Sequence, residues 1–482
     1  MDFWSGDLCK DLKKKGILNN ETDLAFALST DGVKVFKSRR DFHIWPLILV
    51  NLNLPPQERY KRRNILVVGF VPGPNNPKDM DSFLAPLVKE FMALEEGIEG
   101  VWNGWRKTTF TLRAYICIVS GDMPARATLQ GFKGNRALRH CPYCYQSGVW
   151  NKTVYCPSRL PNDIPSGAKV PPASSFKSPE NLHIRTHDET INIGRVISMT
   201  KSEDTRKKYG INGILLLAHL ASIDLIRSFP PDSMHLFFEN VIPDMAAHWR
   251  GRFWDRAKIF VKTPSKEEGA PPPHPSTTKP TRQRKKNANK ENWEANQQPK
   301  ARKSVKFQSN DDPWNLEPEF WDRMGRDMLS SNANYPAAFG DALRDIWDHS
   351  NHFKAAEWRT WALTIAPIFL KDSSKGQDSR DYNAFIALVD AIRMSSEYRI
   401  KQSAVSRIKV SNLGLNPFHQ YPPANVLNSI IKVLFVDFVK YYEGRYYRHE
   451  WDRLGACLPV FHQLLHVADS IQWNGPMYSY SQ

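Results

Sequence analysis

Two strand-like runs that each end in an acidic residue constrain this 482-residue chain more than any other feature. The first alternates bulky and small apolar side chains over residues 23–30 and ends at Asp31, and the second covers residues 112–121 and ends at Asp122. When two neighbouring strands each carry an acidic residue at the carboxyl end, their carboxylates can surround a divalent metal ion at one edge of the sheet. Carboxylate oxygens are ligands that Mg²⁺ prefers, and Mg²⁺ keeps coordination positions open for phosphate. The two runs therefore predict a Mg²⁺ or Mn²⁺ site on an α/β fold.

The order of the elements around these runs narrows the fold class. Strands are expected over residues 23–31, with a continuation over 33–36 after the Asp31-Gly32 turn, and over 44–53, 64–70 and 110–120, and helices over 81–96 and 124–130. Three strands, a helix, a strand and a helix is the order of an RNase H-like core, whose first acids sit on the first and fourth strands. This placement favours a catalytic interpretation over the alternative that Asp31 and Asp122 only make turns with their neighbouring glycines.

A two-metal site of this kind requires a third acid, and three residues are candidates. We favour Glu357, which lies in a stretch with helical apolar spacing, and keep Glu239 and Asp244 as alternatives. A surface Glu357 that pairs with a neighbouring Arg or Lys is the simpler structural interpretation. Asp232 and His235 lie close to Glu239 and Asp244 in the sequence. His235 has two equally good interpretations: a role beside the acidic residues, or a histidine buried in the core.

The pair Cys141-Pro-Tyr-Cys144 has the spacing of half a tetrahedral Zn²⁺ site, because two thiolates on a tight turn reach one metal. The candidates for the other half are Cys156 and His187, which we favour, together with His140 and His183. Two free thiols in a turn are the alternative.

His462 and His466 have the i,i+4 spacing of a helical metal-binding pair. Gln463 stands where the HExxH pattern has Glu, so that pattern is absent. We interpret both histidines as structural or DNA-facing.

Charge points to a polyanionic partner. The formal net charge of +16 and the pI near 9.4 favour nucleic acid first and an anionic membrane surface second. Residues 262–306 carry 12 Lys or Arg against 4 Asp or Glu and almost no aliphatic residues, which predicts a disordered segment. This segment contains two basic runs, whose Lys and Arg residues are Arg282, Arg284, Lys285, Lys286, Arg302 and Lys303. We interpret the runs as nuclear-localisation or phosphate-contact patches, and the alternative is that they are solvated charge.

Other global features exclude some classes of protein. No stretch approaches ~18 uninterrupted apolar residues, so we expect no transmembrane helix. The first residues lack a secretory pattern, and six cysteines in so long a chain do not make a disulfide framework, so a reducing intracellular compartment is expected.

In order and spacing, several stretches resemble the transposases of CACTA-type cut-and-paste DNA transposons, particularly the fungal branch called Plavaka. These stretches are residues 28–33, 45–56, 73–83, 121–125, 131–134 before the Cys pair, 232–235 and 353–359. The resemblance implies an RNase H-like nuclease with an acidic triad and helical material inserted before the third acid. By this carry-over Asp31 and Asp122 match the first two acids, Glu357 is our choice for the third, and Asp232 and His235 match a D-x₂-H element near the site. Family members usually carry more sequence upstream, which suggests a truncated or decayed copy.

We therefore expect an α/β protein: an RNase H-like mixed five-stranded sheet with flanking helices, a small zinc-knuckle-like insertion and a large helical insertion. The expected parts are 1–130 for the first part of the core, 131–200 for the Cys/His knuckle, 201–350 for the helical insertion and 351–482 for the helical C-terminal part. The expected function is strand cleavage and strand transfer at transposon ends by two-metal phosphoryl transfer, in the nucleus, on double-stranded DNA, with a homo-oligomer left open. The alternatives are an inactive transposase-derived DNA-binding protein, another RNase H-like nuclease and a zinc-stabilised interaction module.

Overall fold

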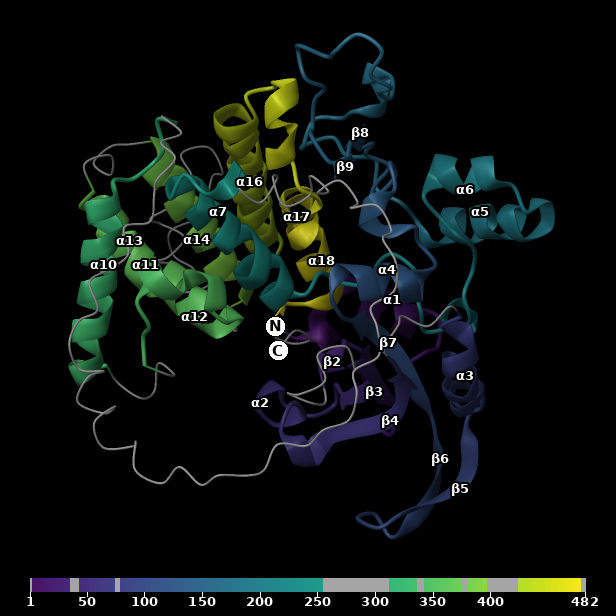
Figure 1. Ribbon diagram of the computed structural model, residues 1–482. Coiled ribbons are helices and arrows are strands. Elements are labelled where there is room, and N and C mark those ends of the chain that lie inside the picture. The colour runs from purple at the N-terminus through teal and green to yellow at the C-terminus, as the bar shows by residue number, and fades with distance from the viewer. Residues whose placement is uncertain are drawn as a thin grey trace, which may run out of the picture.

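The chain folds around one mixed sheet with helices on both of its faces, as the computed structural model in Figure 1 shows. The structure describes residues 2–34, 43–73, 79–254, 312–335, 342–373, 380–396 and 424–477. The segment 262–306, with the basic residues Arg282, Arg284, Lys285, Lys286, Arg302 and Lys303, lies outside the described residues.

Five strands form the central sheet. They are β1 (Leu24–Ser29), β2 (Val33–Lys34), β3 (His43–Asn51), β4 (Ile65–Pro72) and β7 (Ala114–Ser120). β3 pairs antiparallel with β4 along one edge and with β1 and then β2 along the other, and β1 pairs parallel with β7. The order is therefore β4–β3–β1–β7, and the first and last of the long predicted strands lie side by side in the same direction.

Helices supply most of the remaining structure. Those before the segment 255–311 are α1 (Asp7–Lys14), α2 (Pro56–Arg59), α3 (Asp81–Glu96), α4 (Met123–Gln130), α5 (His187–Thr200), α6 (Glu203–Tyr209), the π-helical turns η6 (Met234–Val241) and α7 (Ile242–Trp249). Those after it are α10 (Pro318–Ser331), α11 (Ile346–His349), α12 (Ala355–Thr360), α13 (Ala366–Lys371), α14 (Arg380–Ser396), α16 (Ala424–Tyr442), α17 (Pro459–Gln463) and α18 (Val467–Asn474). Within the described ranges, no helix combines the length and the hydropathy that a membrane span needs.

The two faces of the sheet enter two different cores, because side chains alternate along each strand. Leu28 and Leu49 pack toward α3, whose apolar residues recur at helical spacing. Ala27 and Val50 point the other way, into the large core that includes α1, α7 and the C-terminal helices. All seven residues of β7 are buried, which explains why its sequence is apolar throughout rather than alternating.

The stretch predicted as one strand over residues 110–120 forms two strands of two sheets. β6 (Thr108–Leu112) pairs with β5 (Ile98–Asn103) in a hairpin that extends away from the body in Figure 1, whereas β7 begins at Ala114 and pairs with β1. Only Arg113 interrupts the apolar run between the two strands, so the sequence pattern did not reveal the break.

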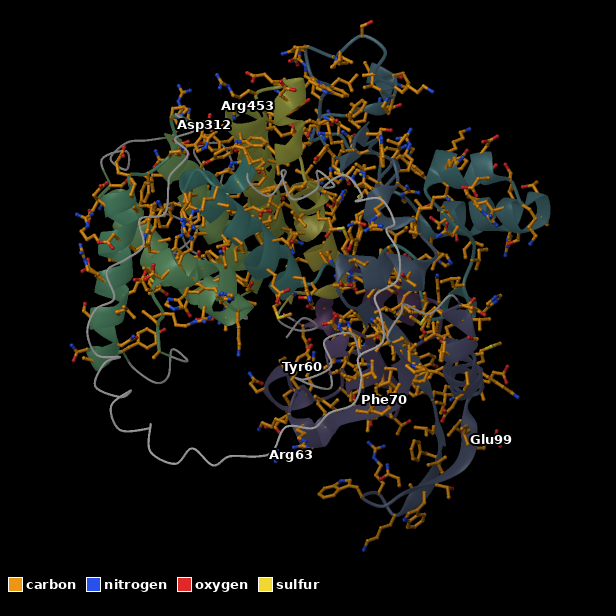
Figure 2. All side chains as sticks on the ribbon, viewed as in Figure 1. Tyr60, Arg63, Phe70, Glu99, Asp312 and Arg453 are labelled. Atoms are coloured by element: carbon orange, nitrogen blue, oxygen red, sulfur yellow. The ribbon has the colours of Figure 1, made fainter. Side chains whose placement is uncertain are left out.

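The C-terminal helices pack back onto the N-terminal part of the chain. α18 contacts α1 and α16, and α16 contacts α14. Asp312, where the described chain resumes, forms an ion pair with Arg453, and the two are labelled near each other in Figure 2. Segments that are far apart in the sequence are therefore neighbours in the fold.

Candidate functional site

The ends of β1 and β7 bring the backbone before Asp31 and the backbone before Asp122 together. Ser29 and Ser120 are partners in the parallel register, and the Thr30 amide donates to the Ser120 carbonyl at 3.4 Å. A Cβ on Gly121 would lie 2.8 Å from the Thr30 carbonyl oxygen, a distance that real Cβ atoms essentially never show. The close approach of the two strand ends therefore depends on glycine at position 121.

Both aspartates use one oxygen for a local backbone contact. Asp122 caps α4, and its Oδ1 accepts a hydrogen bond from the Ala125 amide at 2.7 Å. Asp31 Oδ1 accepts from the Gly32 amide at 2.7 Å, and its side chain is 52 % exposed. Each carboxylate has a second oxygen that a cation can coordinate.

Two acidic residues and a histidine, from η6 and the turn before it, lie close to the strand end that carries Asp31. His235 Nδ1 lies 3.0 Å from Asp232 Oδ2, and His235 Nε2 lies 3.9 Å from Asp31 Oδ2 and 3.7 Å from Glu239 Oε2. Asp232, His235 and Glu239 are spaced i, i+3 and i+7, so a helical backbone places them on one face. The imidazole thus stands between carboxylates that come from two distant parts of the sequence.

The surroundings of His235 favour its charged form. Burial lowers the pKa of His235, but the hydrogen bond and charge of Asp232, together with the charges of Glu239 and Asp31, outweigh burial and raise this pKa to about 9. At neutral pH a positive charge therefore lies between Asp31 and Glu239.

A pocket of about 410 Å³ opens at this place, and we call it the acidic pocket. Its acidic and basic lining residues are Asp122, Arg126, Asp232, His235 and Glu239. Residues of α17 and the residue before it, among them Gln463, form another part of the wall, and the buried Arg126 guanidinium donates to Gln463 Oε1 at 3.3 Å. The C-terminal part of the chain therefore helps to shape the pocket at the strand ends.

Glu357, which the sequence analysis favoured as the third acid, lies outside the lining of the acidic pocket. Asp31 is not part of the lining either, but it lies 3.9 Å from the lining residue His235. Arg344 donates to both of its carboxylate oxygens at 2.5 Å, and the Lys354 amide donates to Oε2 at 2.8 Å. Burial raises the pKa of Glu357, but these donors outweigh it and leave the pKa below its usual value. This ion pair at the start of α12 gives Glu357 a structural role, but its partner is Arg344, 13 positions away, and not a basic residue beside it on the helix. Asp244, the other alternative, is 2 % exposed on α7, so Glu239 is the candidate that the structure brings to Asp31.

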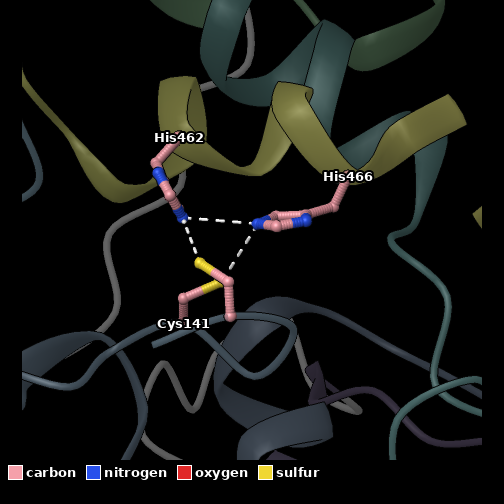
Figure 3. Close-up of side chains that lie close together, drawn as sticks. Cys141, His462 and His466 are labelled. Carbon is pink, nitrogen blue, oxygen red and sulfur yellow. Dashed lines mark hydrogen bonds between the residues drawn. The ribbon is translucent and has the colours of Figure 1, made fainter. Parts of the chain in front are cut away.

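A second constellation, which we call the Cys/His cluster, joins Cys141 and Cys144 to His462 and His466 (Figure 3). Cys141 Sγ lies 3.4 Å from His466 Nε2, Cys144 Sγ lies 3.2 Å from His462 Nε2, and the two Nε2 atoms are 3.4 Å apart. All four side chains are buried, and their potential ligand atoms lie within 4.8 Å of one another. Two thiols and two imidazoles in this arrangement are a ligand set that suits Zn²⁺.

The other residues that the sequence analysis considered for zinc are not among these four. The Cys156 amide donates to the Cys457 carbonyl, and His187 Nδ1 accepts from the Leu225 amide at 3.1 Å. His140 packs edge-on against His462, with ring centroids 5.3 Å apart, and His183 packs against Tyr145.

The sequence contained a signal for the second half of the cluster, the His462 and His466 pair, but the sequence analysis interpreted these histidines as structural or DNA-facing. C-x₂-C followed by H-x₃-H is the ligand inventory of a Cys₂His₂ site. The usual version places the pairs close together, whereas here 318 positions separate Cys144 from His462. The absence of HExxH excludes only the zinc-protease arrangement of His462 and His466, not a structural site.

The fold and the acidic pocket define a mixed α/β protein with carboxylates at the ends of neighbouring parallel strands. In a comparison with known families, residues 9–156, which are less than half of the chain, match the family described as Transposase family tnp2, and this match supports a transposase family. The matched range contains Asp31, Asp122, Cys141 and Cys144. A search of curated proteins found no match to the chain.

Proposed function

We propose that this chain is a transposase of the CACTA type that cleaves DNA strands at the ends of its element and joins the freed 3′-hydroxyl to target DNA. The observation that carries this proposal is that Asp31 and Asp122 follow two neighbouring parallel strands, while Glu239 shares His235 with Asp31 and the acidic pocket with Asp122. The transposase match supports it, because the matched range includes both strand-end aspartates.

The strand order supports an RNase H-like core. Such a core needs its first and fourth strands as parallel neighbours, so that the acids following them meet, and β1 and β7 have this relation. A further segment runs along the outer edge of β7: the Val119 amide donates to the Ser228 carbonyl at 2.7 Å, and Ser222 Oγ donates to the Ile116 carbonyl at 2.7 Å. This segment occupies the position of a further strand beside the fourth.

The acidic residues suit Mg²⁺ or Mn²⁺. Asp31, Asp122 and Glu239 would hold the ions with hard carboxylate oxygens. When bound, two such ions activate the attacking oxygen and stabilise the leaving oxygen of a phosphoryl transfer.

The protein's own side chains would orient the reacting DNA. The hydrogen bond from His235 Nδ1 to Asp232 fixes the ring so that Nε2 faces the strand-end acids. A proton held at Nε2 can be donated to a phosphate oxygen that enters the acidic pocket. The net charge of +16 supports double-stranded DNA as the partner, and the Lys/Arg runs of 262–306 support a nuclear location.

Metal-dependent nicking by the full chain tests this proposal and its choice of third acid. The substrates are supercoiled plasmid and a labelled DNA duplex, each with Mg²⁺ or Mn²⁺. We expect Asp31→Asn, Asp122→Asn and Glu239→Gln to lower nicking by roughly a thousand-fold while duplex affinity changes only a few-fold. Glu357→Gln is the matched control, and we expect it to nick like the parent chain.

Each alternative result has a defined meaning. Full nicking by Glu239→Gln together with loss in Glu357→Gln would show that Glu357 is the third acid. Duplex binding by the parent chain without any nicking would favour a non-catalytic DNA-binding protein. Released fragments without joined strands would favour a hydrolytic nuclease of the same fold.

A further inference from the structure

The Cys/His cluster has the dimensions of a filled tetrahedral metal site. Zinc bonds of about 2.0–2.3 Å to nitrogen and sulfur place tetrahedral ligand atoms roughly 3.3–3.8 Å apart. Two of the three distances in the cluster, both 3.4 Å, lie within this range, and the third, 3.2 Å, lies just below it. Four protein ligands complete the coordination of Zn²⁺, so such a site is structural rather than catalytic.

Packing alone does not explain the four side chains. His462 and His466 direct Nε2 atoms toward each other and toward two thiols in a buried space, where only some of these groups can share protons. One cation would satisfy all four at once.

The cluster joins two parts of the chain that meet at the acidic pocket. Cys141 and Cys144 lie in the loop that follows α4, whose N-cap is Asp122, and His462 lies on α17. From the same short helix Gln463 lines the pocket and accepts a hydrogen bond from Arg126 of α4. A metal at the cluster would therefore hold α17 against the strand ends.

We propose that Cys141, Cys144, His462 and His466 bind one structural Zn²⁺, which fastens the C-terminal helices to the sheet and fixes one wall of the acidic pocket. The metal site itself is independent of the proposed DNA chemistry. Only its effect on the pocket rests on the proposed function.

Zinc content of the purified full chain tests the site. Elemental analysis should find about one Zn²⁺ per chain, and replacement by Co²⁺ should produce the visible absorption of a tetrahedral cobalt–thiolate centre. Cys144→Ser and His462→Asn should each lower zinc content at least about tenfold. Cys156→Ser, which alters another buried cysteine that the sequence analysis considered a ligand, is the matched control and should keep its zinc.

A second measurement covers variants that do not fold. Chelation of zinc from the parent chain should lower the midpoint of thermal unfolding, and added Zn²⁺ should restore it, because metal that binds only the folded state stabilises that state. Parent chain without bound zinc after purification with zinc present, or equal zinc in the parent and both ligand variants, would overturn the proposal. If zinc binds as expected but no variant or condition supports nicking, the zinc site stands and the proposed function fails.

Discussion

Gly121→Ala is the substitution that most directly tests how the two strand ends create the acidic pocket. The added Cβ would lie 2.8 Å from the Thr30 carbonyl oxygen and 3.3 Å from the Ala125 Cβ, whereas ordinary contact begins at 3.4 Å. The first of these atoms is backbone, so no side-chain rotation relieves the overlap. The strand ends must therefore separate by several tenths of an ångström.

The overlap determines the size of the expected effects. Overpacking of this kind destabilises a protein by about 1–3 kcal/mol, and we expect a loss of that size in the free energy of unfolding. Because Asp31 and Asp122 directly follow the displaced residues, their carboxylates move apart with them. A misplacement of 1 Å can cost about 100-fold in rate, so a smaller shift here should cost roughly 10-fold in metal-dependent nicking.

Urea unfolding and plasmid nicking measure the two effects separately. Gly104→Ala is the matched control: its Cβ meets nothing within 4 Å, so we expect its stability and nicking to stay close to those of the parent. Unfolding and nicking of Gly121→Ala that equal those of Gly104→Ala would refute the argument that glycine permits the approach. Loss of stability with unchanged nicking would refute only the argument that displaced strand ends move the carboxylates of Asp31 and Asp122 apart.

Two further predictions concern stability. Burial outweighs the hydrogen bonds from Ser158 and raises the pKa of Glu443 from 4.5 to about 7. A pKa that is raised in the folded state adds stability below about pH 4.5, and this stability is lost as the pH rises through 7. Between pH 5 and 8 the free energy of unfolding of the parent, measured in urea, should therefore fall by up to roughly 3 kcal/mol relative to that of Glu443→Gln. Parallel pH profiles of the two proteins would contradict this. Arg126 donates from a buried guanidinium to the carbonyls of Gly121 and Phe229 and to a side-chain oxygen of α17. Arg126→Met removes this donor from all three acceptors, of which the Phe229 carbonyl keeps the Tyr143 hydroxyl as a donor at 2.7 Å. The substitution should cost about 2–4 kcal/mol by the same assay, and an unchanged midpoint would show that the other acceptors find new partners.

Much of the sheet could be predicted from local pattern. The strands that became β1, β3 and β4 were placed within a few residues, and the helix expected over residues 81–96 has those bounds. The prediction depended on side-chain periods that each element carries in its own sequence. It failed over residues 110–120, where one apolar run supplies strands to two different sheets and pairing partners, not composition, decide the break.

The candidate site divides in the same way. Asp31 and Asp122 could be named because each follows a recognisable strand, and parallel strand ends meet at one edge of a sheet. The sequence left three candidates for the third acid. Our proposal of Glu239 in place of Glu357 rests on the contact of Glu239 with His235 and on the ion pair of Glu357 with Arg344. Both are facts of packing.

The amino-acid sequence by itself determined the strand ends and their acids, because backbone periodicity and turn chemistry act over a few residues. Only the tertiary structure decided which side chains complete each constellation. Cys141 and His466 are 325 positions apart, and His235 meets Asp31 across 204 positions (235 − 31). No local pattern records such meetings, because they arise from the burial of many distant apolar side chains in a shared core.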